Sequence, residues 1–545
     1  MPRKIINIVS DITVESKAQE IDRFEKDDFQ FHRPPMDHQL RVFERSKDAI
    51  FHGYLMDMGT GKTKVTIDNV CYLHQKAMIN AFLVVAPKGM YHQWAWGQND
   101  PKKPKGHRST WDPDPMPPGY RSKKREWDKD ATEYSHSRSL VYVWNNSCSA
   151  ANLKQQDFLF KSASDMKILV MNTEAFSTPK GAAFAEKFVR KHKTLMAVDE
   201  ASLIKHHTAK RTKSMISTGG YAAYRRILTG TPISNSPLDV FGFESFLDYS
   251  IFGKSWFAFR SKYAVLKDQF VQNRSFKVVT GYKNLDEMKR RLDQFNTRIS
   301  KGDCMDLPPK LYMPREVPLT PEQEKMYTNM HENAVAYLND LEYVTATIVL
   351  SQLTKMRQIL CGYIKDDDGV VHPVPTNRIT AVLEIIEELD GKVVIWCPYR
   401  QPLFDLAAEL KKAHGPESYG LYMGAGDGVD VRDRGQTQDT FNDPDSKMRF
   451  LLLTYGSGKY GLNLTCVKYS VRIALDYDLD ALLQSEDRCH GKGRGLGEEP
   501  QTYIDLVSPG TVDEKIVESL IGKKSIADLI TGDKWRAFLT NEELF

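Results

Sequence analysis

The sequence of 545 residues is too long for one hydrophobic core, and at roughly 100 to 200 residues per domain it predicts two or three domains. Lysine and arginine outnumber aspartate and glutamate by only 75 to 71, so a nucleic-acid site must be a local patch. The seven cysteines form no C-x-x-C pair that would suggest zinc or a redox couple. No apolar stretch resembles a signal peptide or approaches the roughly 20 residues of a membrane span, so we expect a cytoplasmic protein with reduced thiols.

The string MDMGTGKT, at residues 56–63, is the first that carries chemistry. A glycine-rich turn that opens a helix lets successive backbone N–H groups surround phosphate oxygens, while the lysine reaches the terminal phosphates and the threonine hydroxyl binds magnesium. The strict pattern has glycine at position 56, where this sequence has Met56. The alternative is an ordinary glycine turn with an exposed lysine. The residues that we predict to hold ATP here are Gly59, Thr60, Gly61, Lys62 and Thr63.

Short apolar runs alternate with helical patterns, which is typical of parallel α/β architecture. A stretch at about residues 97–139 breaks this pattern because it is rich in proline, lysine and arginine, and we interpret it as a surface insertion. It either binds phosphates and stacks on bases or forms a solvated loop. Its basic and aromatic residues include Lys102, Lys103, Lys105, Trp111, Arg121, Lys123, Lys124, Arg125 and Trp127. The candidate strands of the first half are 81–87, 167–172, 195–200 and 224–231.

Two adjacent carboxylates, Asp199 and Glu200, end the third of these strands. Open parallel sheets bind their ligands at this edge. We expect Asp199 to hold magnesium and Glu200 to accept a proton from the attacking water. A solvated acidic pair is the alternative, and the phosphate loop upstream argues against it. The pair formed by His206 and His207 lacks further ligands at metal spacing, so we predict no metal site beyond the nucleotide-bound magnesium.

Residues 246–371 lack buried-strand runs and carry leucine and methionine at helical spacing, which predicts a mostly helical connector. The second half then repeats the α/β style. In its first helical pattern Val382, Ile385 and Ile386 share a face, and Gly391 stands where a helix stop belongs. The candidate strands of this half are 393–398, 449–455, 471–476 and 502–507. Two α/β lobes are therefore predicted.

The order of these segments resembles the Swi/Snf-like branch of superfamily two helicases along nearly the whole chain. PPMDHQL resembles the element in which a glutamine reads the adenine, which makes Gln39 the candidate, and VVAPKGMYHQW resembles motif Ia, with Trp94 at its tryptophan. VDEAS is similar to the D-E-x-x box, with Ser202 where histidine is commoner. LTGTPISNS, the most specific string, resembles the third motif, in which Thr229 and Thr231 would link hydrolysis to the grip on nucleic acid.

The resemblance continues in the second half. VVIWCPYR resembles motif IV, and YGSGKYGLNLT resembles motif V, which implies that Gly461 faces the nucleotide and Asn463 the nucleic acid. QSEDRCHGKGR is similar to motif VI, which implies that Gln484 and Arg488 face the ATP, with Arg488 as an arginine finger. A guanidinium from a second lobe can neutralise charge on the transferred phosphoryl group only when the cleft closes, which couples closure to hydrolysis.

Motif VI departs from the family pattern, because Gly491 stands where a second arginine is usual. Lys492 and Arg494 follow in a glycine-rich stretch that is flexible enough to swing either side chain toward the phosphates. We favour Arg494 as the replacement, since a planar guanidinium can bridge two phosphate oxygens. The alternative is that both side chains are solvated or hold DNA phosphates. The short connector and the lack of a recognisable histone-reading module favour a bacterial or phage motor.

The resemblance implies an α/β fold of two RecA-like parallel-sheet lobes in tandem. It divides the chain into an ATP-binding lobe at 1–245, the mostly helical connector at 246–371, and a helicase C-terminal lobe at 372–545. The string TVDEKIVESLIGKK resembles the family's closing brace helix, which packs across the lobes.

The resemblance also implies a nucleic-acid-stimulated ATPase that uses ATP and Mg²⁺. The leading hypothesis is a monomeric translocase on duplex or branched DNA, acting in repair, recombination or replication. It would hold the phosphate backbone independently of sequence, with contacts at Lys205 and 209–214. A strand-separating DNA or RNA helicase is the second hypothesis. The third is an ATP-regulated clamp or scaffold with weak hydrolysis.

Overall fold

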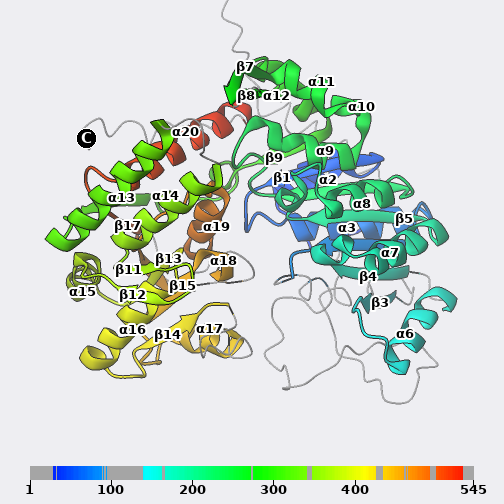
Figure 1. Ribbon diagram of the computed structural model, residues 1–545. Helices are drawn as coiled ribbons and strands as arrows, with labels where there is room; N and C mark the ends of the chain where they lie inside the picture. Colours follow the sequence, from blue (N-terminus) through cyan, green and yellow to red (C-terminus); the bar gives the residue numbers. More distant parts are fainter. Residues whose placement is uncertain are drawn as a thin grey trace, which may run out of the picture.

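Two fully parallel sheets, one in each half of the chain, form the framework of the computed structural model (Figure 1). The structure describes residues 29–531 except 32, 89, 91–93, 95–138, 163–165, 272–273, 340–345, 425–433, 459–461, 463, 465 and 491–498. Among the described residues, no helix combines the length and the apolar character that a membrane span requires.

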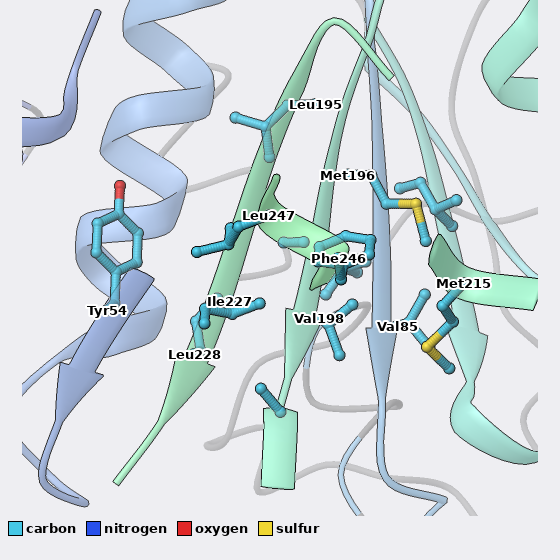
Figure 2. Close-up of a cluster of buried hydrophobic side chains, with 14 of the residues drawn as sticks. Tyr54, Val85, Leu195, Met196, Val198, Met215, Ile227, Leu228, Phe246 and Leu247 are labelled. Carbon is cyan, nitrogen blue, oxygen red and sulfur yellow. The ribbon is translucent and has the colours of Figure 1, made fainter. Parts of the chain in front are cut away.

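The first sheet has seven strands in the order β3-β4-β2-β5-β6-β1-β9. Its central strands are buried on both faces, and therefore read as continuous apolar runs. Figure 2 shows Met215 and Phe246, from two of the covering helices, among strand side chains such as Val198. The strands are β1 (Phe51–Met56), β2 (Ala81–Ala86), β3 (Ser139–Val143), β4 (Met166–Asn172), β5 (Thr194–Asp199), β6 (Tyr224–Thr229) and β9 (Asn296–Ile299). The helices are α2 (Asp37–Ser46), α3 (Lys62–Gln75), α6 (Ala150–Lys161), α7 (Pro179–Lys191), α8 (Lys210–Gly219) and α9 (Val240–Leu247).

The second sheet has six strands in the order β10-β17-β16-β13-β15-β14. Its core packs on both faces, around Trp396 on one and Ile395 on the other. The strands are β10 (Lys310–Glu316), β13 (Lys392–Cys397), β14 (Tyr419–Tyr422), β15 (Phe450–Thr454), β16 (Val467–Arg472) and β17 (Gln501–Val507). The helices are α15 (Asn377–Glu388), α16 (Gln401–His414), α17 (Arg434–Asn442), α18 (Tyr455–Gly458) and α19 (Leu479–Cys489).

The eight predicted strands all correspond to strands of the two sheets. The segment predicted at 471–476 is displaced, because β16 ends at Arg472 and the buried residues Ile473 and Ala474 follow the strand. The predicted helix stop at Gly391 lies three residues beyond the end of α15, and its backbone has a φ of +79°.

The segment between the lobes corrects one expectation. Residues 246–371 were predicted to form a mostly helical connector because they lack apolar strand runs, yet β9 pairs with β1 in the first sheet and β10 pairs with β17 in the second. β9 has the polar sequence NTRI and β10 is a largely exposed edge strand, so neither shows an apolar run. The other elements are α10 (Tyr249–Phe252), α11 (Trp256–Tyr263), β7 (Ala264–Val271), β8 (Arg274–Tyr282), α12 (Leu285–Phe295), α13 (Pro321–Asn339), α14 (Ala346–Leu360), β11 (Tyr363–Lys365) and β12 (Val371–Pro373).

Helix α20 (Val512–Thr531) contacts both halves of the molecule (Figure 1). Its residues Ile516 and Leu520 are buried in a cluster with Leu475 and Leu479 of the second lobe. Further along the helix, Ala527 is buried in the core cluster of the first lobe, and α20 contacts α12 there.

Candidate ATP site between the two lobes

The predicted phosphate loop connects the end of β1 to the start of α3. Gly59 and Gly61 have φ values of +82° and +96°, in the left-handed region that favours glycine. A Cβ on Gly61 would lie 2.2 Å from the side-chain nitrogen of Gln39, so a larger residue there would displace the end of that side chain. Thr60 is buried in the loop, whereas the side chain of Thr63, in the first turn of α3, is exposed.

Lys62 occupies the interior of this loop. Its Nζ donates hydrogen bonds to the carbonyl oxygens of Met56, at 2.7 Å, and Asp57, at 3.2 Å. Burial lowers the pKa of Lys62, although the carboxylates of Glu200 and Asp199 act in the opposite direction. The side chain of Met56, which stands at the glycine position of the strict pattern, is fully buried, and its backbone carbonyl accepts the hydrogen bond from Lys62.

Gln39 lies against the same loop, at the start of α2. Its Nε2 donates to the carbonyl oxygen of Thr60 at 3.1 Å, and its Oε1 accepts a hydrogen bond from the backbone N–H of Met36 at 3.1 Å. The ring of His38 also contacts the carbonyl oxygen of Thr60, at 2.8 Å. The segment predicted to read the adenine is thus fixed to the phosphate loop, while adenine recognition by Gln39 stays a prediction.

Asp199 ends β5, on the same sheet edge as the phosphate loop. Its Oδ2 accepts a hydrogen bond from the indole Nε1 of Trp94 at 2.8 Å, and its Oδ1 accepts one from the backbone N–H of Glu200 at 3.0 Å. Burial raises the pKa of Asp199, and the hydrogen bond from Trp94 and the charge of Lys62 oppose that shift. The resemblance located Trp94 in the sequence but did not predict this contact.

Glu200 turns away from Asp199 because its backbone is left-handed, with a φ of +56°. Its Oε1 accepts hydrogen bonds from the hydroxyls of Ser202, at 3.0 Å, and Thr229, at 3.2 Å. Burial raises the pKa of Glu200, and Lys62 opposes this shift. The two adjacent carboxylates therefore have different partners, as their separate predicted roles require.

The predicted third motif, in the first lobe, makes a hydrogen bond to the second lobe. Thr229 Oγ1 accepts a hydrogen bond from the backbone N–H of Thr231 at 3.2 Å, and the hydroxyl of Thr231 donates to the carboxylate of Asp480 on α19. The same carboxylate accepts a hydrogen bond from Nε2 of Gln484 at 3.0 Å. Asp480 was not predicted as a site residue, and its position four residues before Gln484 was the only signal in the sequence.

Arg488 of α19 lies at the phosphate loop. One guanidinium nitrogen donates to the carbonyl oxygen of Leu462 at 3.2 Å, and another lies 3.4 Å from the sulfur of Met58 in the loop. The side chain is only 9% exposed. Burial lowers the pKa of Arg488, and the carboxylates of Asp487 and Glu200 oppose this shift. The residue predicted as an arginine finger is therefore brought to the predicted ATP site across the lobe boundary.

Other predicted residues are engaged in the fold or lie outside the described residues. Lys205 donates a hydrogen bond at 2.7 Å to the hydroxyl of Ser234, a residue of the third motif. Within 209–214, Arg211 donates to the carbonyl oxygen of Leu203. The ring of His207 stacks on Trp256, with centroids 4.2 Å apart. The candidates outside the described residues are Gly461, Asn463, Gly491, Lys492, Arg494 and the basic and aromatic residues of the insertion.

Comparison with known proteins gives two family matches that adjoin each other. The SNF2-related domain matches residues 123–363, and the helicase conserved C-terminal domain matches residues 377–493. Within the solved structures, the "Sulfolobus solfataricus SWI2/SNF2 ATPase core in complex with dsDNA" is 21% identical, with 95% of this chain and 97% of that chain covered and a TM-score of 0.39.

Two curated relatives cover most of this chain. The SWI/SNF-related matrix-associated actin-dependent regulator of chromatin subfamily A member 1 of Mus musculus is 24% identical over 86% of this chain and 40% of its own length. The DNA repair and recombination protein RAD54-like of Drosophila ananassae is 23% identical over 89% of this chain and 60% of its own length. The chain thus spans about half the length of these relatives. With its two parallel sheets and both family domains, the chain belongs to the SNF2-related family of helicase-type ATPases.

Proposed function

We propose that the chain is an ATP-driven motor that translocates along double-stranded DNA. The observation that carries this proposal is the position of Arg488, a second-lobe guanidinium beside Met58 of the first-lobe phosphate loop. A cation that reaches the site from a separate lobe can stabilise phosphoryl transfer only while the cleft is closed. Each turnover would then be linked to one closing and one opening of the lobes.

The residues of the first lobe would divide the work of hydrolysis. Lys62 would exchange its carbonyl partners for the phosphates of ATP, and Glu200 would orient and deprotonate the attacking water. The exposed hydroxyl of Thr63 and the carboxylate of Asp199 form an oxygen donor set that fits magnesium. When bound, magnesium would neutralise charge on the phosphate oxygens.

A chain of hydrogen bonds would carry the state of the ATP site to the lobe boundary. It runs from Glu200 through Thr229 and Thr231 to Asp480 of the second lobe. The last of these bonds must break when the lobes separate. The position of the catalytic glutamate and the separation of the lobes would thereby be coupled through two hydroxyl groups.

Double-stranded DNA is the substrate that we propose. The RAD54-like relative is described as a DNA repair and recombination protein, and the mouse relative as a regulator of chromatin, which supports duplex DNA as the track. Repair, recombination or replication is the setting that we propose for this chain. Contacts to the phosphate backbone would make movement independent of base sequence.

The test measures ATP turnover with single-stranded DNA, duplex DNA, branched DNA and RNA, together with displacement of a third strand from a triplex. We expect strong stimulation by duplex DNA, triplex displacement without strand separation, and DNA affinity that falls with salt at a slope of about −0.9 per neutralised phosphate. Stimulation by single-stranded RNA alone, or separation of a duplex, would favour a strand-separating helicase. DNA binding that depends on ATP but with no stimulated turnover would favour a clamp.

A further inference from the structure

The segment that joins the two lobes leaves the first sheet after β9. At that point it is hydrogen-bonded to the phosphate loop. The backbone N–H of Asp57 donates to the carbonyl oxygen of Ile299 at 2.9 Å, and a carboxylate oxygen of Asp57 accepts the backbone N–H of Lys301 at 2.9 Å. The other carboxylate oxygen of Asp57 forms an ion pair with Arg298 at 2.8 Å. These contacts hold the backbone of Lys301 against the phosphate loop.

The side chain of Lys301 crosses to the second lobe. Its Nζ lies 2.6 Å from Oδ1 of Asp487 and donates a second hydrogen bond to the carbonyl oxygen of His490 at 2.7 Å. Lys301 is only 8% exposed, so the ammonium is largely shielded from water and its attraction to the carboxylate is weakly screened. Burial alone would raise the pKa of Asp487, but the Lys301 and Lys310 ammonium groups outweigh it and lower that pKa.

Both partners of Lys301 flank the arginine finger. Asp487 precedes Arg488 directly, and His490 follows it by two residues at the end of α19. A single ammonium group, held by its own backbone to the phosphate loop, thus contacts the helix end that carries Arg488. We propose that Lys301 is a positioning residue that keeps Arg488 aligned with the phosphate loop. This inference rests on the proposed function, the stimulated hydrolysis of ATP.

The reason is geometric. The contact of Arg488 with Met58 of the first lobe is to a weakly accepting sulfur. The contacts of the Lys301 ammonium with Asp487 and with the carbonyl of His490, called here the Lys301 tie, are charge-assisted. Because this tie has two acceptors, it fixes both the distance and the rotation of the end of α19. Misplacement of a catalytic group by about 1 Å can cost on the order of 10²-fold in rate. Loss of the tie should therefore lower turnover even though Lys301 is not assigned to touch ATP.

The chain offers a matched control on the same helix. Lys310 of β10 forms an ion pair with Glu486 at 2.8 Å, one residue before Asp487. This pair also anchors α19, but both of its members belong to the second lobe. Lys310→Met therefore removes a lysine–carboxylate pair from the same helix without cutting a connection to the phosphate loop.

The first experiment compares kcat and the KM for ATP, at saturating duplex DNA, in the wild type, Lys301→Met, Lys301→Arg and Lys310→Met. We expect Lys301→Met to lower kcat by about 10- to 100-fold with KM changed by less than about threefold, while Lys301→Arg retains most of kcat. Lys310→Met should lower kcat by less than about threefold, because its pair does not reach the first lobe. Equal losses in Lys301→Met and Lys310→Met, or wild-type kcat in Lys301→Met, would overturn the inference. If Lys301→Met does not fold, Asp487→Asn tests the same tie with an uncharged residue of equal shape.

The second experiment does not depend on hydrolysis. Fluorescent labels on α6 and α16 report the separation of the lobes by energy transfer in the full chain without nucleotide. We expect Lys301→Met to increase the open population and Lys310→Met to leave it unchanged. If the lobes of Lys301→Met are more open but no DNA stimulates ATP turnover by the wild type, the proposed function is overturned and the connection through Lys301 is retained. If DNA stimulates ATP turnover by the wild type, but Lys301→Met and Lys310→Met do not differ in kcat or in lobe separation, only the role of Lys301 is overturned.

Discussion

Thr231 of the first lobe donates a hydrogen bond to the carboxylate of Asp480 on the second, one helical turn before Gln484. The third-motif loop therefore has hydrogen-bond partners on both sides, because Thr229 of the same loop donates to Glu200. A change in lobe separation cannot leave this loop unaffected, since Asp480 moves with the second lobe.

The hydroxyl of Thr231 that donates to Asp480 can be removed by substitution. Thr231→Val keeps the shape of the side chain but cannot donate to Asp480, so we expect basal hydrolysis to persist while stimulation by duplex DNA falls by about tenfold. Thr231→Ser keeps the donor and serves as the control. A double-mutant cycle with Asp480→Leu, which removes the acceptor, should give a coupling energy of about 1 kcal/mol or more, and simple additivity of the two losses would contradict direct coupling.

The second prediction separates ATP binding from the chemical step. Lys62→Ala removes the cation that faces the phosphates, so we expect weaker binding of a fluorescent nucleotide and no stimulated turnover. Glu200→Gln keeps the shape and the binding cations but loses the base, so the variant should retain ATP and stall. Normal turnover in either variant would show that the site has been assigned wrongly.

The third prediction concerns the indole of Trp94, which donates to Asp199. Trp94→Phe leaves this carboxylate less firmly oriented, so we expect the magnesium concentration for half-maximal turnover to rise by about 10- to 100-fold, with kcat recovering at high magnesium. Trp396→Phe is the matched control, because the indole nitrogen of this buried tryptophan makes no hydrogen bond within the described part of the chain. An equal magnesium requirement in the two variants would remove Trp94 from the metal site.

The fourth prediction addresses the missing arginine of motif VI. Arg488→Ala should lose about 10³-fold or more in turnover at saturating ATP and DNA, the size of effect seen for arginine fingers. If Arg494 replaces the absent second arginine, Arg494→Ala should also be impaired, and Gly491→Arg should rescue it. If Arg494→Ala hydrolyses ATP like the parent protein while Arg488→Ala is inactive, one arginine finger is sufficient.

The fifth prediction concerns pH and the buried carboxyl group of Glu244. This group accepts a hydrogen bond from Asn296 of β9 at 3.0 Å, and burial raises its pKa to about 8. Between the ordinary pKa of 4.5 and about 8 the folded state holds a proton that the unfolded state releases. The free energy of unfolding therefore falls as pH rises, by up to about 1.4 kcal/mol per unit, and levels off above about pH 8.

Glu244→Gln should remove this slope and stabilise the protein at pH 8. Urea unfolding between pH 6.5 and 8.5 measures it. His52 is present in both proteins, so its contribution cancels in the comparison. Burial lowers its folded pKa to about 3, so that contribution rises with pH up to its ordinary pKa of 6.5 and then levels off. The same slope in Glu244→Gln and in the wild type would assign the pH dependence to another group.

Local sequence was sufficient to locate the segments of the candidate site that lie within one turn or one strand end, while the roles of their residues stay predictions. The phosphate loop, the carboxylates of Asp199 and Glu200, and the third motif each combine a buried strand with the residues that follow it, and such patterns are visible along the chain. The same holds for the central strands of both sheets, whose burial on two faces leaves uninterrupted apolar runs.

The features that the sequence did not reveal depend on contacts between distant segments. Strand β9 is polar and short, and only its pairing with β1 makes it part of the first sheet. Asp480 and Lys301 become candidate site residues because the other lobe supplies their partners, and the spacing of Asp480 from Gln484 does not by itself indicate a partner in the first lobe. Trp94 was found through family resemblance, but its hydrogen bond to Asp199 joins residues that are far apart in the sequence.

The path of α20 has a consequence for how the protein can be divided into fragments. Ala527, near the end of the described chain, completes the core of the lobe that contains the phosphate loop. A fragment that stops after the first sheet would expose the apolar surface of α12 that this helix covers, and isolated expression of that lobe should yield an aggregation-prone protein. The second lobe in isolation would carry a helix with an uncovered apolar end. The two halves are separate in their sheets but interdependent as folding units, so fragments for biochemical work should supply α20 to both.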